Sequence, residues 1–162
     1  MFINAIQIGM ADYKVAKTPE KLATIGLGSC VAICVYDFEN KTGGLAHVML
    51  PDSTIAKEVK NPAKFADTAV PMLLDEMGKL GSLRRNIHIK IAGGAHMFSF
   101  KTRENVLNIG ARNVEIIERI CKQEGINIIA KDVGGNCGRS VLFDLATGIV
   151  YVKTINQGVA EI

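Results

Sequence analysis

A cysteine and a histidine that could act together as a nucleophile and its base lie close to each other in the sequence. Cys30 ends the stretch GLGSC, and His47 lies in the stretch AHVML. A thiol attacks a carbonyl carbon as its thiolate, so it needs a base that takes its proton and hydrogen-bond donors for the oxyanion that develops. His47 is the candidate base, and the N–H groups of the turn at Gly28 and Ser29 are candidate donors. The alternative is that both are ordinary strand residues, because most free cysteines are buried and unreactive.

Two adjacent strands must position this pair. The segments VAICVYD and GLAHVML are typical of a β-hairpin around the turn DFENKTG. If Ala32 lies opposite His47, Cys30 shares the face of His47 one diagonal step away, at about 7–8 Å between backbones. If Ile33 lies opposite His47, the two side chains point to opposite faces of the sheet. The sequence leaves both registers open, and a catalytic pair requires the first register or a β-bulge.

The other three cysteines are weaker candidates for the nucleophile. Cys34 lies further along the strand of Cys30, and Cys121 lies on the apolar face of a predicted helix, so we expect both in the core. Cys137 lies in a glycine loop, where Arg139 could favour its thiolate. No histidine is close to Cys137 in the sequence, which makes Cys30 the better candidate.

Glycine is concentrated in three loops, GLGSC (26–30), AGGAHMF (92–98) and DVGGNCGR (132–139). The first is not a dinucleotide-binding fingerprint, because it lacks the third glycine and precedes a strand where a helix is required. The loops also lack the Lys–Ser/Thr pair that a phosphate-binding P-loop needs. Any one of them could be a simple tight turn. Three such loops in one small domain favour a functional site, because active sites collect on loops.

Short apolar runs of strand length, rich in valine and isoleucine, dominate the chain. Two segments have helical spacing instead, residues 61–81, which Asn61 and Pro62 would begin, and residues 108–125. We expect a kink or a break at Pro71, inside the first helix. Many strands and two helices predict an α+β fold with helices on one side of β layers. The predicted strands are FINAIQIG, VAICVYD, GLAHVML, NIHIKIA, INIIAKDV, RSVLFDL and GIVYVKTI.

Composition limits the class of protein. The length of 162 residues suits a single domain, residues 1–162, and a net charge of +3 favours an acidic partner only slightly. It is too small to indicate nucleic-acid binding. No apolar run approaches the roughly 20 residues that span a bilayer, and the start of the chain lacks the features of a signal peptide. We therefore expect a cytoplasmic protein with reduced cysteines, and the scattered histidines make a zinc site improbable.

Six segments, in order along the chain, closely resemble the CheD family of chemoreceptor glutamine deamidases. They are TIGLGSCVAICVYD, GGLAHVMLPDS, KFADTAV, KIAGGAHMF, NIGARN and DVGGNCGRSV, and the resemblance runs from about Gly9 to Val152. It implies a layered α/β/β sandwich with mostly antiparallel or mixed sheets and two main helices. Such a fold would be similar to that of bacterial toxins that deamidate glutamine.

The resemblance also implies the roles of individual residues. Cys30 would be the nucleophile, His47 its partner, and Thr24 the residue that orients the histidine. The implied reaction is hydrolysis of specific glutamine side chains on methyl-accepting chemotaxis receptors to glutamate, with release of ammonia and without a metal or an organic cofactor. Cys137 is not a position on which the family depends. His96 departs from the family, which usually has a smaller residue between AGGA and MF.

The implied partners are the helical cytoplasmic regions of the receptors and a CheC-type phosphatase. Two other functions compete with the deamidase. One is an adaptor that binds receptor or CheC-type phosphatase helices without catalysis, and the other is a cysteine hydrolase of a different amide or thioester. The intact set of Thr24, Cys30 and His47 favours an enzyme, since an adaptor does not need a reactive thiol.

Overall fold

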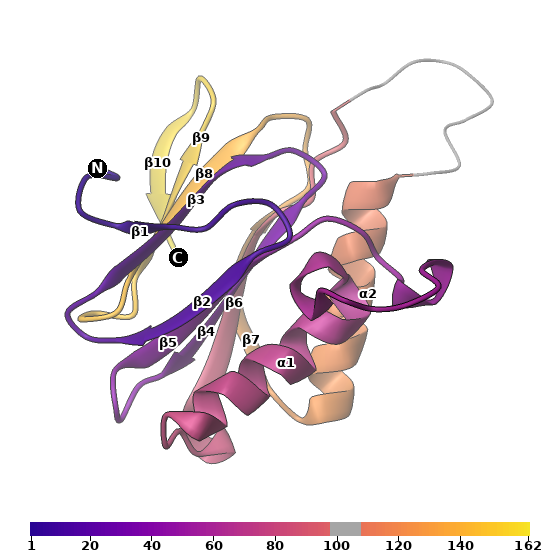
Figure 1. Cartoon of the computed structure of the whole chain (residues 1–162). Helices are drawn as coiled ribbons and strands as arrows, with labels where there is room; N and C mark the ends of the chain where they lie inside the picture. The colour runs from indigo at the N-terminus through magenta and orange to yellow at the C-terminus, as the bar shows by residue number, and fades with distance from the viewer. Residues whose placement is uncertain (98–107) are drawn as a thin grey trace.

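The computed structural model describes residues 1–97 and 108–162, which form two five-stranded sheets and two main helices. Their arrangement in layers is visible in Figure 1. The first sheet has the order β1 (Ile6–Gln7), β3 (Lys21–Leu27), β8 (Arg139–Asp144), β9 (Val150–Thr154) and β10 (Gly158–Glu161). The second has the order β2 (Tyr13–Lys17), β5 (Thr42–Val48), β4 (Val31–Asp37), β6 (Ile87–Gly93) and β7 (Ile128–Val133). The helices are α1 (Ala66–Lys79) and α2 (Ile109–Glu124), and the short 3₁₀ turns are η1 (Ser53–Ile55), η2 (Pro62–Lys64) and η3 (Arg84–Asn86).

The layers follow the order helices, second sheet, first sheet, so the predicted α+β layered architecture is confirmed (Figure 1). Each sheet is mixed, because β1–β3 and β6–β7 are parallel pairs while the other neighbours are antiparallel. None of the helices in the described ranges is long and apolar enough to cross a membrane.

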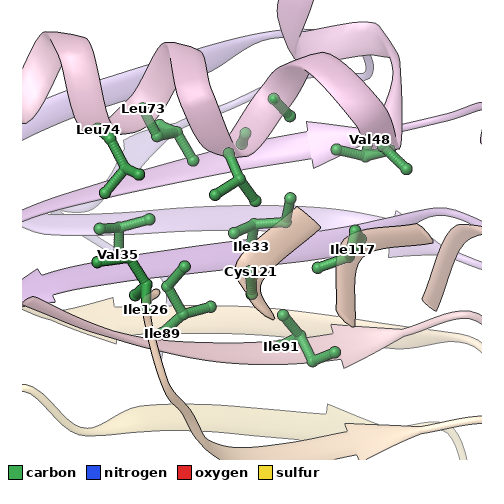
Figure 2. Packing of buried hydrophobic residues seen from close by; sticks show 14 of the residues in the cluster. Ile33, Val35, Val48, Leu73, Leu74, Ile89, Ile91, Ile117, Cys121 and Ile126 are labelled. Atoms are coloured by element: carbon green, nitrogen blue, oxygen red, sulfur yellow. The ribbon is translucent and has the colours of Figure 1, made fainter. Parts of the chain in front are cut away.

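Strand β4 lies in the middle of the second sheet and is buried on both faces. Val31, Ile33 and Val35 pack toward α1 and α2, as Figure 2 shows for the last two. Ala32 and Cys34 alternate with them and belong to a second core between the two sheets. This double burial explains why the sequence VAICVYD is apolar throughout instead of alternating.

Helix α1 begins later than the sequence predicts. Asn61 and Pro62 begin the short turn η2, where the Asn61 side chain accepts a hydrogen bond from Ala63, and α1 itself starts at Ala66. The helix continues through Pro71 without a break. Pro71 removes one backbone donor from the helix. The buried side chain of the adjacent Val70 packs into the core between the helices and the second sheet, and this packing stabilises the helix at that point.

Helix α2 matches the prediction closely. It ends at Glu124, and Gly125 adopts the left-handed conformation with φ of 70° that terminates many helices. Glu118 on its surface pairs with Lys131 of β7 at 2.8 Å. This ion pair ties α2 to the edge of the second sheet.

Three strands were absent from the sequence prediction, β2, β3 and β10. The predicted strand FINAIQIG shortens to Ile6–Gln7. Strand β3 matters most for the site, because it contains Thr24. After β3, which belongs to the first sheet, the chain crosses to β4 in the second sheet. The residues between them, 28–30, form the connection between the sheets, and Cys30 is the last residue of that connection.

Candidate active site

The register of the β4–β5 hairpin brings the two predicted residues to one face. Ala32 lies opposite His47, so the first of the two registers is confirmed. Cys30 precedes β4 by one residue and belongs, with Ala32 and Leu45, to the core between the sheets. Side chains alternate along a strand, so His47, two residues after Leu45, points into the same space. Cys30 and His47 are therefore diagonal neighbours between the two sheets.

Thr24 joins His47 to the first sheet. Its hydroxyl oxygen Oγ1 lies 2.7 Å from the carbonyl oxygen of Ile8 and 2.7 Å from Nδ1 of His47. A carbonyl can only accept, so Thr24 donates its single proton to Ile8. Thr24 must then accept from His47, which assigns the ring proton to Nδ1 through the hydrogen-bond network. In the neutral imidazole this leaves Nε2 unprotonated, as a general base requires.

The second ring nitrogen of His47, Nε2, is buried without a hydrogen bond to any of residues 1–97 and 108–162. Burial lowers the pKa of His47 to about 4, because an imidazolium would lose its hydration there. The ring is therefore neutral at neutral pH. A buried acceptor without a partner destabilises the fold and calls for an explanation, such as a catalytic role.

Cys30 is almost inaccessible, with 9% of its surface exposed. Burial raises the pKa of its thiol, and a hydrogen bond from the backbone N–H of Cys30 itself acts in the opposite direction. The resting pair is thus a thiol beside a neutral imidazole. Cys30 contributes to the wall of a pocket of about 370 Å³. The lining residues are Gly26, Gly28, Ser29, Cys30, Ala95, His96, Met97, Asn108, Ile109 and Gly110.

Two of the three glycine loops predicted from the sequence line this pocket, and the third, DVGGNCGR, bonds to the middle one. Residue 98 of the middle loop lies outside the described residues, but its earlier part bonds to both other loops. These hydrogen bonds join the connection that contains Cys30 to the end of β6, and the end of β6 to the β7–β8 loop. They are Gly94 N–H to Cys30 O, Ala95 N–H to Gly28 O, His96 N–H to Gly135 O and Gly134 N–H to Gly93 O, at 2.8–3.0 Å.

Two glycines permit this close approach. Gly93 has φ of 117°, and a Cβ there would overlap the carbonyl oxygen of Cys30. A Cβ on Gly110 at the start of α2 would lie 2.5 Å from the carbonyl oxygen of Ala95. Any larger residue at either position would push the backbone of the site apart.

Asn113 of α2, which is not among the candidate residues predicted from the sequence, also contacts the site. It is fully buried, and its Nδ2 donates to the carbonyl oxygens of Ser29 at 3.0 Å and Met49 at 3.2 Å. It belongs to the segment NIGARN, one of the six that resemble the CheD family. A polar asparagine at a core-facing helical position was the available signal.

The remaining cysteines lie as predicted, except for the surroundings of Cys137. Cys34 and Cys121 are buried, and burial is the main cause that raises the pKa of each thiol to about 12. Cys137 is partly exposed. The guanidinium of Arg139 donates to the carboxylate of Asp132 and to backbone carbonyl oxygens, including that of Cys137. Arg139 therefore stabilises its own loop.

Two further points concern ligands. His96 lines the same pocket as Cys30, and its backbone N–H donates to the carbonyl oxygen of Gly135 at 2.8 Å. Within the described residues, no group of three or more His, Cys, Asp or Glu side chains is arranged so that it could hold a metal ion.

Comparison with known proteins gives full-length relatives. A family model described as CheD chemotactic sensory transduction matches residues 49–154. A protein of Clostridium novyi (strain NT) named "Probable chemoreceptor glutamine deamidase CheD" is 48% identical over 159 residues, which cover 98% of each chain. A protein of the same name from Clostridium botulinum (strain Hall) is 47% identical over 162 residues, 100% of each chain. The second similarity therefore includes residues 24–47, which precede the family-model match.

Proposed function

Because this chain belongs to the CheD family, we propose that it deamidates glutamine side chains of chemoreceptors by means of Thr24, Cys30 and His47. The observation that carries the proposal is the 2.7 Å contact between Thr24 Oγ1 and His47 Nδ1. It supports a neutral imidazole whose Nε2 is available to a thiol on the same face of the hairpin. The product is glutamate, and ammonia is released.

The first half of the reaction forms a thioester. Cys30 Sγ attacks the amide carbon of the glutamine side chain while His47 Nε2 takes the thiol proton. The amide oxygen becomes an oxyanion, which backbone N–H groups of the connection at Gly28, Ser29 and Cys30 would hold. The C–N bond then breaks, and the nitrogen leaves as ammonia with the proton from Nε2.

The second half returns the enzyme to its starting state. Water gives a proton to His47 Nε2 and attacks the thioester carbon. The C–S bond breaks, the glutamate carboxyl group is released, and Cys30 recovers its proton from His47. One water is consumed and one ammonia is formed for each glutamine.

The neutral resting pair fits this substrate. An amide has a poor leaving group, so the reaction needs a proton on the base when the C–N bond breaks. At neutral pH the Cys30 thiol carries that proton, and the neutral imidazole of His47 has Nε2 available to take it. The thiolate forms as the substrate is attacked, which protects the nucleophile when no substrate is bound.

The proposed partners are chemoreceptors, whose glutamines lie on helical regions in the cytoplasm, and a CheC-type phosphatase that offers a comparable helix. The net charge of +3 supports docking on a helix rich in glutamate. We also propose that the protein acts in the cytoplasm, because the receptor glutamines that it would convert are there.

The direct test incubates the protein with the cytoplasmic fragment of a chemoreceptor from the same organism. Peptide mass spectrometry should find the replacement of –NH₂ by –OH at specific glutamines, with ammonia released in equal amount. Binding of the fragment with no glutamine converted would refute the enzyme and support the adaptor. Conversion of a small amide or thioester with no action on the fragment would support a different hydrolase.

A further inference from the structure

Asn113 holds two chain segments that both end at the active site. Ser29 immediately precedes Cys30, and Met49 follows His47 by two residues. The last opposed pair of the β4–β5 ladder is Val31 with Val48. Beyond that pair the strands no longer bond to each other, and the Asn113 amide donates to a carbonyl of each.

The direction of the Asn113 side chain follows from these two bonds. Both partners are carbonyl oxygens, which only accept, so the –NH₂ group of the amide must face them. The oxygen Oδ1 is buried and has no partner among the described residues. A buried acceptor left unpaired destabilises the fold. The two hydrogen bonds of Asn113 to Ser29 and Met49 are therefore present although the unpaired Oδ1 lowers the stability of the fold.

The bond to Ser29 also fixes the direction of the next N–H group. In a trans peptide the C=O and the following N–H point in opposite directions. When the Ser29 carbonyl points to Asn113, the Cys30 N–H must point away from α2. This N–H donates to no acceptor in residues 1–97 or 108–162 apart from the sulfur of Cys30. It thus lies beside the atom that attacks the substrate.

We propose that Asn113 is a positioning residue that orients the Ser29–Cys30 peptide so that the Cys30 N–H receives the oxyanion of the reaction. This inference rests on the proposed cysteine chemistry and adds the source of its oxyanion stabilisation. Asn113 itself does not touch the substrate. Asn113 acts by holding the Ser29 carbonyl, and the planar peptide bond then fixes the direction of the Cys30 N–H.

Two reagents separate the oxyanion from the thiol. A short peptide whose glutamine side-chain amide is replaced by an aldehyde adds to Cys30 and forms an adduct with an oxygen in the oxyanion position. Iodoacetamide alkylates the same sulfur by displacement of iodide, and no oxyanion forms at any stage. A defect in oxyanion stabilisation weakens the first reaction and leaves the second unchanged, whereas displacement of the thiol slows both.

The variants are Asn113→Asp and Asn113→Ala, with Ile117→Val as the control. Aspartate keeps the shape but presents a carboxylate to two carbonyl oxygens, and alanine removes the donors without that repulsion. Ile117 is also fully buried one turn later on α2, so Ile117→Val loosens the same helix without changing a hydrogen bond. Circular dichroism and urea unfolding give the amount of folded protein for each variant.

Loss of an oxyanion donor costs about 100-fold or more, so we expect at least about 10-fold weaker aldehyde binding in both Asn113 variants. The alkylation rate should stay within about 3-fold of the parent, and kcat on the receptor fragment should fall with little change in KM. Unchanged aldehyde binding, or a parallel fall in aldehyde binding and alkylation, would overturn the inference. Absence of deamidation by the parent protein would refute the proposed function instead, and the aldehyde comparison would still test Asn113.

Discussion

The hydroxyl of Thr24 fixes the tautomer of His47, as a carboxylate does in many hydrolases, but without a negative charge. A carboxylate beside the ring would favour the imidazolium. Thr24 gives the ring a hydrogen-bond acceptor only, and burial keeps the pKa of His47 low, at about 4. In the proposed mechanism, the site therefore starts its cycle neutral and separates charge only when an amide is attacked.

Replacement of Thr24 should affect turnover more than folding. In Thr24→Val the shape is kept, but His47 Nδ1 loses its acceptor, and the ring can adopt the wrong tautomer. We expect ammonia release to fall about 100-fold or more, because loss of the tautomer-fixing group is that costly in related chemistry. Thr24→Ser keeps a hydroxyl and should retain most of the activity. Equal activity of the valine variant and the parent would show that Thr24 does not orient His47.

The low pKa of His47 also predicts how stability depends on pH. Between pH 6.5 and about 4 the unfolded chain protonates this histidine while the folded chain excludes the proton. Stability must fall as the pH drops through this window. At pH values below this window, the free energy of unfolding should be lower by about 3 kcal/mol, since each unit of difference in pKa corresponds to about 1.4 kcal/mol.

The control for this prediction is His47→Gln, which removes the titrating ring and leaves His88 in place. Urea unfolding at several pH values should show a steeper loss of stability in the parent than in the variant. The same slope for both proteins would mean that His47 is not held neutral in the fold.

Residue types and spacing were enough to select Cys30 and His47, and the resemblance to CheD added Thr24. The carbonyl of Ile8 and the side chain of Asn113 could not be predicted in the same way. One reaches the site through a parallel pairing in the first sheet, and the other through the docking of α2. Both contacts join residues far apart in the sequence, and no local pattern records them.

At the level of elements, the site depends on how closely three glycine loops approach one another. The N–H of Gly94 donates to the carbonyl of Cys30, and the adjacent Gly93 leaves no space for a side chain. The end of β6 thus supports Cys30, the residue just before β4, on the side of β4 opposite to β5. This backbone contact with β6 helps to hold the proposed nucleophile in position.

Gly93→Ala should damage both stability and activity. The left-handed φ of 117° and the overlap with the Cys30 carbonyl oxygen would force the backbone to shift. We expect a loss of about 1–3 kcal/mol and slower deamidation for each folded molecule. The matched control is Gly78→Ala in α1, where a Cβ meets nothing within 4 Å and should stabilise the helix by up to about 1 kcal/mol. Thermal unfolding and ammonia release measure both, and full activity of Gly93→Ala would contradict the role of this close approach.

The sequence predicted both helices and the strands of the central hairpin, because each has a strong local signal. It could not determine the register of the hairpin. Strand β4 is buried on both faces, so no polar side distinguishes Cys30 and Ala32 from Val31 and Ile33. Strand β3 was missed because KLATIGL mixes polar residues with a glycine, and its partners β1 and β8 are distant in the chain.

For the whole molecule, the site lies where the chain passes from one sheet to the other. Thr24 belongs to the first sheet, His47 to the second, and Cys30 to the connection between β3 and β4. The packing of the sheets therefore assembles the site, and helices α1 and α2 support the second sheet from its far side (Figure 1). The similarity to toxin-type deamidases remains a prediction.

Binding of a receptor should survive the loss of catalysis. One glutamine side chain offers little contact area, so most of the binding energy must come from the surface around the pocket. Cys30→Ser keeps the shape of the site but has a much poorer nucleophile. It should bind the receptor fragment about as well as the parent in calorimetric titration and release no ammonia. Loss of binding by a folded variant would place the site within the docking surface and favour the adaptor.

The most direct test of the account compares single alanine substitutions of the four cysteines on one receptor fragment. Mass spectrometry of its peptides measures the conversion of each glutamine to glutamate. Cys30→Ala should convert none, because the nucleophile is lost. Cys34→Ala, Cys121→Ala and Cys137→Ala should convert the same glutamines as the parent, apart from stability losses of about 1–2 kcal/mol where a core contact is removed. Conversion by Cys30→Ala, with loss of activity in a folded Cys137→Ala, would contradict the account.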